Sequence, residues 1–260
     1  MRWTVLGASA VRPNPGGACS GYLLETDEGA YLVDCGPGVI SRLLLHRPLR
    51  ELAGVLISHG HADHCLELVT LRLALRYTPV PERRVGLPLH IPPGMDRQLE
   101  ALGAVFHDDM GTDPHEDYWL PVLERRTYDP AAPLELPGVT VTFARTNHYV
   151  PCWAMRFTDA RGRVLVYGAD GGPCDAVTDL ASGADLLVLE SAFPRRAGHE
   201  GDLGHLAPEE AGAVAAAAGA RRLVLTHTFS AYDRAAMCAA AAGACDVPVE
   251  VASEGRSWSV

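Results

Sequence analysis

Short apolar runs recur along the chain between turn-forming residues, and their lengths are typical of β-strands. Early runs form hairpin-like pairs, with Thr26–Gly29 as one predicted turn, whereas later runs alternate with helical stretches. The predicted strands are Trp3–Leu6, Cys19–Glu25, Ala30–Asp34, Gly54–Ser58, Val85–Ile91, Val139–Arg145, Cys152–Phe157, Arg163–Tyr167, Asp185–Glu190, Arg221–Thr226, Val249–Ala252 and Arg256–Val260.

Four segments have the apolar periodicity of helices, and two of them also have clear end signals. Pro208–Ala218 begins with Pro and two Glu, which are favoured in the first turn of a helix. Asp233–Ala242 is followed by Gly243, a common helix-ending residue. With Val39–His46 and Leu66–Tyr77 as the other two, the pattern predicts an α/β protein with sheets in the middle and helices outside.

Residues 78–138 differ from the rest of the chain because ten Pro interrupt them. Apolar segments such as Val85–Ile91 nevertheless run through this region, which argues against a plain linker. We interpret residues 1–260 as a single domain with an elaborated Pro-rich region at 78–138 that overhangs a site; a true domain boundary is the alternative.

Composition and charge narrow the classes of function. The chain has 260 residues, of which 48% are hydrophobic and 21% charged, as in an ordinary soluble globular protein. All 22 basic residues are Arg, so chemistry that needs a Schiff-base Lys or a P-loop Lys is excluded. The net charge of −10 disfavours extended contact with nucleic acid.

The expected compartment follows from three simple features. Seven Cys, none in C-x-x-C spacing, are expected to be free thiols in a reducing environment. Met1–Gly7 is typical of a strand that enters a glycine turn and lacks the pattern of a signal peptide. No run of 18 uninterrupted apolar residues occurs, so no membrane span is expected. Together these features predict a cytoplasmic protein.

The segment Val55–His64 carries the strongest chemical information. A predicted buried strand runs directly into a His-x-His-x-Asp-His motif over residues 59–64. His59 and His61 are two residues apart at a strand end, so their side chains can point the same way. Four ligand-type side chains within six positions are not typical of a satisfied core and indicate a metal site. Imidazole together with carboxylate suits zinc, with manganese, iron or nickel as alternatives.

This motif resembles that of the metallo-β-lactamase superfamily, and further motifs of the superfamily follow in order along nearly the whole chain. Asp34, in Leu32–Gly36, resembles the Asp of its first motif, which supports the ligand loop. His148, Asp170 and His227, each placed after a predicted strand, resemble its later ligands. The resemblance implies a four-layer αββα sandwich with the site in the cleft between the sheet ends.

The resemblance also implies a centre of two divalent metal ions with seven ligands. The expected ligands are His59, His61 and His148 for one metal, Asp63, His64 and His227 for the other, and Asp170 as the bridge between them. Two metals about 3.5–4 Å apart can share a hydroxide, which is a nucleophile at neutral pH. The same ions polarise the scissile group and stabilise its developing charge.

Two further residues resemble the ribonuclease Z branch of the superfamily, which groups tRNA 3′-processing nucleases with small phosphodiesterases. His205 matches the His that contacts the phosphate in that branch, and Glu190 ends the preceding predicted strand. The resemblance makes His205 a general acid and Glu190 its orienting carboxylate, and with the ligand Asp63 they form the expected catalytic set. A phosphodiester needs such a donor because an alkoxide is a poor leaving group.

The chain departs from the nucleases where they carry a tRNA-binding arm. That arm lies between the positions of His148 and Asp170, where this chain has room only for a strand pair and the turn Thr158–Gly162. We therefore predict a hydrolase, specifically a phosphodiesterase that acts on a small or cyclic nucleotide-type ester through the metal-bridging hydroxide, and not on tRNA. The alternatives are a lactone or thioester hydrolase on the same site, and an inactive metal-binding sensor or interaction protein.

Two expectations concern other contacts. A homodimer is expected from the resemblance and from the largely apolar segment Leu66–Tyr77, for which burial on the sheet is the alternative. Arg195-Arg196, between Glu190 and His205, is the Arg pair best placed for a substrate phosphate. The remaining pairs are interpreted as surface charges: Arg83-Arg84, Arg125-Arg126 and Arg221-Arg222.

Overall fold

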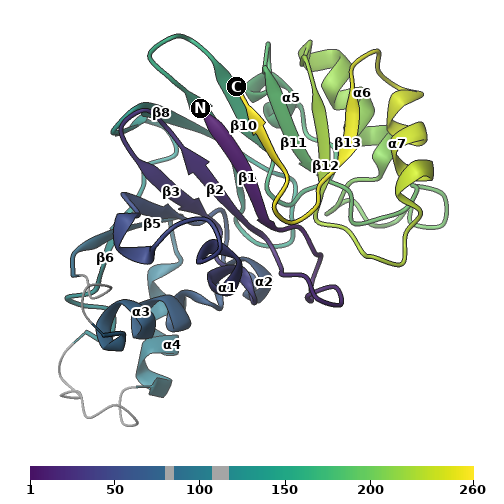
Figure 1. Ribbon diagram of the computed structural model, residues 1–260. Helices are drawn as coiled ribbons and strands as arrows, with labels where there is room; N and C mark the ends of the chain where they lie inside the picture. The colour runs from purple at the N-terminus through teal and green to yellow at the C-terminus, as the bar shows by residue number, and fades with distance from the viewer. Residues whose placement is uncertain (80–84, 107–116) are drawn as a thin grey trace.

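Two β-sheets of seven strands each lie face to face, and helices cover their outer faces (Figure 1). The computed structural model describes residues 1–79, 85–106 and 117–260. The first sheet has the order β14-β1-β2-β3-β4-β5-β6 and the second the order β13-β12-β11-β10-β9-β8-β7. The strands of the first sheet are β1 (Arg2–Gly7), β2 (Gly21–Glu25), β3 (Ala30–Val33), β4 (Gly54–Leu56), β5 (Leu87–Ile91), β6 (Leu123–Thr127) and β14 (Ser257–Ser259). The strands of the second sheet are β7 (Leu134–Leu136), β8 (Val139–Arg145), β9 (Trp153–Thr158), β10 (Val164–Tyr167), β11 (Leu186–Glu190), β12 (Leu223–Thr226) and β13 (Val249–Val251).

The helices divide between the two sheets in chain order (Figure 1). On the side of the first sheet lie α1 (Val39–Leu43), α2 (Ala62–Cys65), α3 (Leu68–Tyr77), α4 (Asp96–Phe106) and a 3-10 turn, η1 (Leu49–Glu51). On the side of the second sheet lie α5 (Asp175–Leu180), α6 (Pro208–Ala218) and α7 (Arg234–Ala242). The two ends of the chain meet in the first sheet, where β1 pairs with β14.

Side-chain alternation along the strands produces three apolar layers between these elements. In β11, Leu187 and Leu189 pack with the helices of the second sheet, whereas Leu186 and Val188 pack in the layer between the sheets. In β3, Leu32 packs in the layer under the helices of the first sheet. The predicted four-layer αββα sandwich is confirmed by these two sheets and three cores.

The predicted elements differ from the observed ones mainly within residues 78–138. This region contributes β5, α4 and β6 on the side of the first sheet and β7 to the second sheet, and only β5 was predicted. Strand β6 lies at a sheet edge, where Glu124, Arg125 and Arg126 can reach solvent, so its sequence lacks the apolar run of a central strand. Helix α5 is likewise observed and was not predicted. The interpretation of residues 1–260 as one domain stays a prediction.

The structure also bears on the expected free Cys, the expected lack of a membrane span and the expected homodimer. All seven Cys are free, as predicted. Across the described ranges, no helix is both long enough and apolar enough to cross a membrane, and the cytoplasmic location stays a prediction. In α3, Leu68, Leu71 and Leu75 are buried in the layer under the first sheet, which accounts for the apolar pattern of this segment. This segment therefore gives no argument for a homodimer, which rests on the resemblance alone and stays a prediction.

Candidate metal centre

The ligand-type side chains gather where strands of both sheets end. The motif over residues 59–64 directly follows β4, and Asp34 follows β3, the parallel neighbour of β4. Asp170 follows β10 and His227 follows β12, which belong to the parallel part of the second sheet. Because parallel strands end at the same edge of a sheet, residues up to 193 positions apart converge on one cleft.

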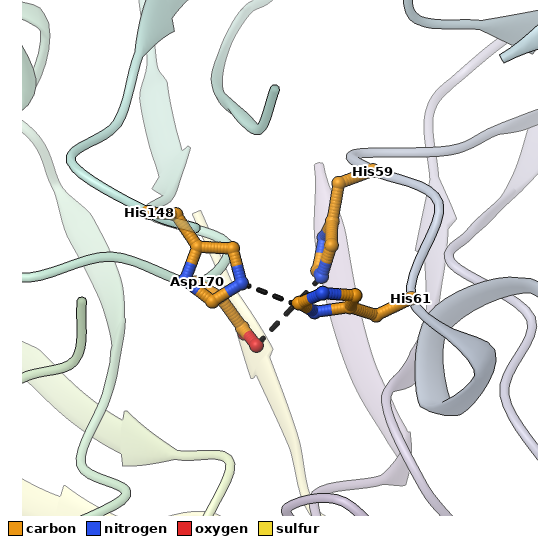
Figure 2. A group of neighbouring side chains, drawn as sticks. All are labelled: His59, His61, His148 and Asp170. Carbon is orange, nitrogen blue, oxygen red and sulfur yellow. Dashed lines mark hydrogen bonds and ion pairs between the residues drawn. The ribbon is translucent and has the colours of Figure 1, made fainter. Parts of the chain in front are cut away.

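The first ligand group consists of His59, His61 and His148, together with Asp170 (Figure 2). One ligand atom from each of the four lies within 4.8 Å of the others. The Nδ1 atom of His61 is 3.1 Å from Nε2 of His148, and Nε2 of His59 is 3.8 Å from Oδ2 of Asp170. Figure 2 shows the four side chains pointing toward one another: His59 and His61 extend from the same loop after β4, and His148 and Asp170 extend from two other loops.

The second ligand group consists of Asp63, His64 and His227. The Nε2 atom of His227 is 3.1 Å from Oδ2 of Asp63. Asp170 also reaches this group, since its Oδ2 atom is 3.3 Å from Nε2 of His64 and 3.3 Å from Nε2 of His227. The carboxylate of Asp170 therefore lies between the two groups, as the position of a bridging ligand requires.

Asp34 holds the ligand loop against both sheets. Its buried carboxylate accepts hydrogen bonds from the backbone N–H and the hydroxyl of Ser58, each 2.8 Å long, and from the Tyr167 hydroxyl at 2.8 Å. It also contacts Nδ1 of His64 at 2.8 Å, which turns Nε2 of that imidazole toward the centre. Ser58 and Tyr167 are functional neighbours that the sequence interpretation missed.

The backbone is strained at three of the strand ends that carry the site. Asp34, Ala169 and His227 have φ angles of 57°, 52° and 50°, a left-handed conformation that residues other than Gly rarely adopt. Ala169 directly precedes Asp170. Such strain persists where surrounding contacts enforce it, and it is concentrated at functional sites.

Buried ligand atoms without hydrogen-bond partners show that these residues fit a metal. Nε2 of His59, Nε2 of His64 and Oδ1 of Asp170 are buried and, among the described residues, accept or donate no hydrogen bond of good geometry. Such orphaned atoms are rare in a folded interior and call for an ion or a ligand. Nitrogen and carboxylate donors converging in this way suit zinc and other divalent first-row metals.

The two ligand groups differ in their electrostatics. Burial lowers the pKa of His59, His61 and His148, and the charge of neighbouring imidazoles lowers it further. Burial also opposes the charge of His64, but Asp170 and Asp34 outweigh it and raise the pKa of this imidazole well above its ordinary value. In the metal-free protein the three imidazoles of the first group therefore favour the neutral form near pH 7, whereas His64 in the second group favours the protonated form.

His205 and Glu190 form a pair that borders both ligand groups. Nδ1 of His205 is 2.8 Å from Oε1 of Glu190, and the same carboxylate accepts backbone hydrogen bonds from Gly171 at 2.7 Å and Ala192 at 3.2 Å. The imidazole of His205 lies 5.0 Å from that of His148 in the first group and 5.8 Å from that of His227 in the second, centroid to centroid. Burial would lower the pKa of His205, but the hydrogen bond and charge of Glu190 raise it to about 9.

The Arg pair next to this site has a different environment from the one expected. Arg196 donates hydrogen bonds to Glu210 at 2.8 Å and to the carbonyl oxygen of His205 at 2.6 Å. Its guanidinium therefore braces the loop that carries His205, while Arg195 is exposed. The pair Arg83-Arg84 lies outside the described residues.

A family model described as a beta-lactamase superfamily domain matches residues 30–228. The chain belongs to the metallo-β-lactamase superfamily. The resemblance drawn from its motifs is confirmed, and the chain is a metallo-hydrolase of this fold with His and Asp clusters able to bind divalent metals.

Individual relatives agree with this assignment. The chain is 32% identical to the probable metallo-hydrolase YhfI of Bacillus subtilis over 90% of each chain. The crystal structure of YhfI matches with a TM-score of 0.85, at 30% identity, over 99% of each chain. Ribonuclease Z of Mycobacterium bovis is 31% identical, with 86% of this chain and 84% of the relative covered. The relation to the ribonuclease Z branch is thereby confirmed.

Proposed function

We propose that this protein is a phosphodiesterase that hydrolyses a small or cyclic nucleotide-type ester with two divalent metal ions, zinc being the first choice. The observation that carries the proposal is the His205–Glu190 pair beside the metal ligands. Ester hydrolysis by a metal-activated water needs the ligands alone, whereas a phosphodiester with an alkoxide leaving group also needs a proton donor.

The metals would be held by the two ligand groups with Asp170 shared between them. When bound, they would supply a nucleophile from water at neutral pH and offset the negative charge that develops on the phosphate. The chain itself supplies their positions: Asp34 orients His64, and Ser58 contacts both Asp34 and Nδ1 of His59, at 3.0 Å in the latter case.

His205 would donate the proton to the leaving oxygen. Glu190 occupies its Nδ1 atom, so the second ring nitrogen, Nε2, is left to face the ester. With its pKa raised to about 9, the imidazole carries both ring protons at neutral pH and acts as an acid without prior protonation. Glu190 would act through His205 as a positioning residue, because it is almost fully buried and is itself held by two backbone N–H groups.

Two features support a small substrate over RNA. All residues between His148 and Asp170 are described, and they form only the β9–β10 hairpin and its flanking turns. The net charge of −10 repels an extended phosphate backbone. The relative named ribonuclease Z supports phosphodiester chemistry, and tRNA as the substrate is an outcome that the test below can detect.

The test is hydrolysis by metal-replete protein of a panel that contains 3′,5′-cyclic nucleotides, bis(p-nitrophenyl) phosphate, a lactone, a thioester and a precursor tRNA. We expect turnover of the phosphodiesters. His205→Ala should lower kcat for the cyclic nucleotide about 10²–10⁴-fold, the usual contribution of a general acid. Its loss on the p-nitrophenyl ester should be smaller, since p-nitrophenolate leaves without protonation.

The matched control is His46→Ala, which removes an exposed imidazole at the end of α1 and should leave both rates unchanged. Metal content must be equal in both variants and the wild type. Equal rates for His205→Ala and the wild type on the cyclic nucleotide would overturn the role of His205. Turnover of the lactone or thioester alone would favour the alternative hydrolase, and turnover of none would favour a metal-binding protein without activity.

A further inference from the structure

A cavity of about 390 Å³ opens beside His61 at the edge of the metal centre. Three loops and the first turn of α4, which carries Gln98, form it: the loop after β4, the loop between β8 and β9, and the loop after β5. The first two of these loops also carry candidate metal ligands. The lining residues are Gly60, His61, Pro92, Pro93, Gly94, Met95, Gln98, Val150 and Pro151. His61 is shared by the cavity and the first ligand group, so whatever fills the cavity touches the centre.

The walls of this cavity are apolar and stiff. Pro92 and Met95 are buried, and Pro93, Val150 and Pro151 add further apolar side chains to the lining. None of the described lining residues is Asp, Glu or Arg, so a charged group gains no ion pair with a carboxylate or guanidinium there; the polar side chains in the lining are Gln98, which donates a hydrogen bond to the carbonyl oxygen of Gly60, and His61. Pro residues fix the local backbone, which makes the cavity preformed. Its volume lies within the range of small-molecule sites.

The cavity and His205 meet the centre at different ligands. One ring nitrogen of His205 lies within 4.8 Å of ligand atoms of Asp170 and His227, whereas the cavity is lined by His61. The imidazole of His148 lies near both residues: its ring centroid is 4.9 Å from that of His61, at the cavity, and 5.0 Å from that of His205. A phosphodiester bound at the metals therefore has an acid near one substituent and an apolar cavity near the other.

We infer that this cavity binds an uncharged, flat organic substituent of the ester, of the size of a nucleobase or an aryl ring, which stays on the phosphorus when the other substituent leaves. The inference rests on the proposed function for the identity of the ester. If the cavity binds this substituent, the protein prefers diesters whose retained group is flat and apolar to diesters whose retained group is small.

The kinetic test compares bis(p-nitrophenyl) phosphate with methyl p-nitrophenyl phosphate, because both release p-nitrophenolate and differ only in the retained group. The ratio of kcat/KM for the two esters is measured for the wild type and for Val150→Trp, which fills the cavity. Dividing the two ratios cancels the intrinsic reactivity of the esters. We expect the preference for the aryl ester to fall about tenfold, within the range that apolar contacts give in a pocket.

Val150→Asn provides a second variant, since it keeps the size of the side chain and removes its apolar character. The matched controls are Val105→Trp and Val105→Asn, on an exposed side chain near the end of α4 that does not line the cavity. The control variants should keep the wild-type ratio. An unchanged ratio in both Val150 variants would overturn the inference.

A binding test separates this inference from the proposed function. Phenylphosphonate and methylphosphonate present the same head group to the metals, and their affinities for the metal-loaded protein are measured by calorimetry. We expect phenylphosphonate to bind about tenfold more tightly, and Val150→Trp to abolish the difference. If this holds while no diester is hydrolysed, the proposed function fails and the cavity assignment stands. If diesters are hydrolysed but the two phosphonates bind equally, or neither binds, the cavity assignment fails.

Discussion

The two ligand groups lie side by side, yet their imidazoles are held by different chemistry. In the first group, Nδ1 of His59 contacts the Ser58 hydroxyl at 3.0 Å, and Nδ1 of His148 contacts the carbonyl oxygen of Gly204 at 2.8 Å. In the second group, Nδ1 of His64 contacts the carboxylate of Asp34 at 2.8 Å. Neutral oxygens thus support one group, and a buried carboxylate supports the other.

The charge of Asp170 and the carboxylate support from Asp34 together raise the pKa of His64, whereas burial lowers the pKa of the first-group imidazoles, so the two groups would receive a metal in different ways. The first group presents imidazoles that burial keeps neutral, so their nitrogens are ready to bind a cation. The second group carries the positive charge of His64, which Asp170 and Asp34 stabilise in the absence of metal. A metal bound there would take the place of a proton, whereas a metal bound in the first group would meet imidazoles that are already neutral. The shared Asp170 links the two.

The largest effect is expected from Asp170→Asn, which removes the charge that both groups share. The variant keeps the shape of the side chain but loses the carboxylate that lies 3.3 Å from both His64 and His227. Hydrolysis of the preferred phosphodiester should fall about a thousandfold or more, because a metal supplies several kcal/mol of charge stabilisation. Metal content is measured on the same samples and should fall at both positions.

The control for this variant is Asp246→Asn, an exposed carboxylate near the C-terminal end of α7. It should retain wild-type rates and metal content. Loss of metal from only one group in Asp170→Asn would show that the carboxylate serves one metal and does not bridge.

A smaller and selective effect is expected from Asp34→Asn. This carboxylate contacts His64 but none of the imidazoles of the first group, so metal affinity at the second group should fall about 10–100-fold, the usual effect of removing a supporting contact. The measurement is metal stoichiometry after dialysis against a graded chelator, with the second metal released earlier than in the wild type. Ser58→Ala is the informative comparison, because Ser58 contacts both Asp34 and His59. Loss of its hydroxyl should therefore lower metal affinity at both groups. Equal weakening of both positions by Asp34→Asn would contradict the division between the groups.

The sequence predicted the local motif from its spacing alone, and the distant site residues through the resemblance to the superfamily. The motif over residues 59–64 places four ligand-type side chains in one loop after a buried strand, and the distant ligands follow further strands in a recognisable order. The supporting contacts were not readable in this way. The Tyr167 hydroxyl reaches Asp34 from the other sheet, across 133 positions, only because the two sheets pack face to face.

The same distinction holds for the fold. Strands with buried apolar runs, such as β11, were predicted close to their observed bounds, because burial on both faces leaves a continuous apolar signal. Strand β6 was not predicted, since its pairing with β5 is long-range and its edge position allows charged side chains. The cavity beside His61 could not be predicted either, because three separate loops and the start of α4 contribute its walls.

The finest test of the difference between the groups is proton release on metal binding. In the metal-free protein the pKa of His64 is raised above its ordinary value of 6.5, so near pH 7 a metal must displace its proton, and affinity at the second group should rise with pH until His64 is deprotonated. The pKa values of His59, His61 and His148 are lowered, so binding at the first group should release no proton from them at pH 7.

Calorimetry in buffers of different ionisation enthalpy measures the protons released at each step. About one more proton should accompany the second group than the first, and Asp34→Asn should reduce this excess by removing one of the charges that hold the proton on His64. Equal proton release at both steps would show that the two groups receive their metals in the same way.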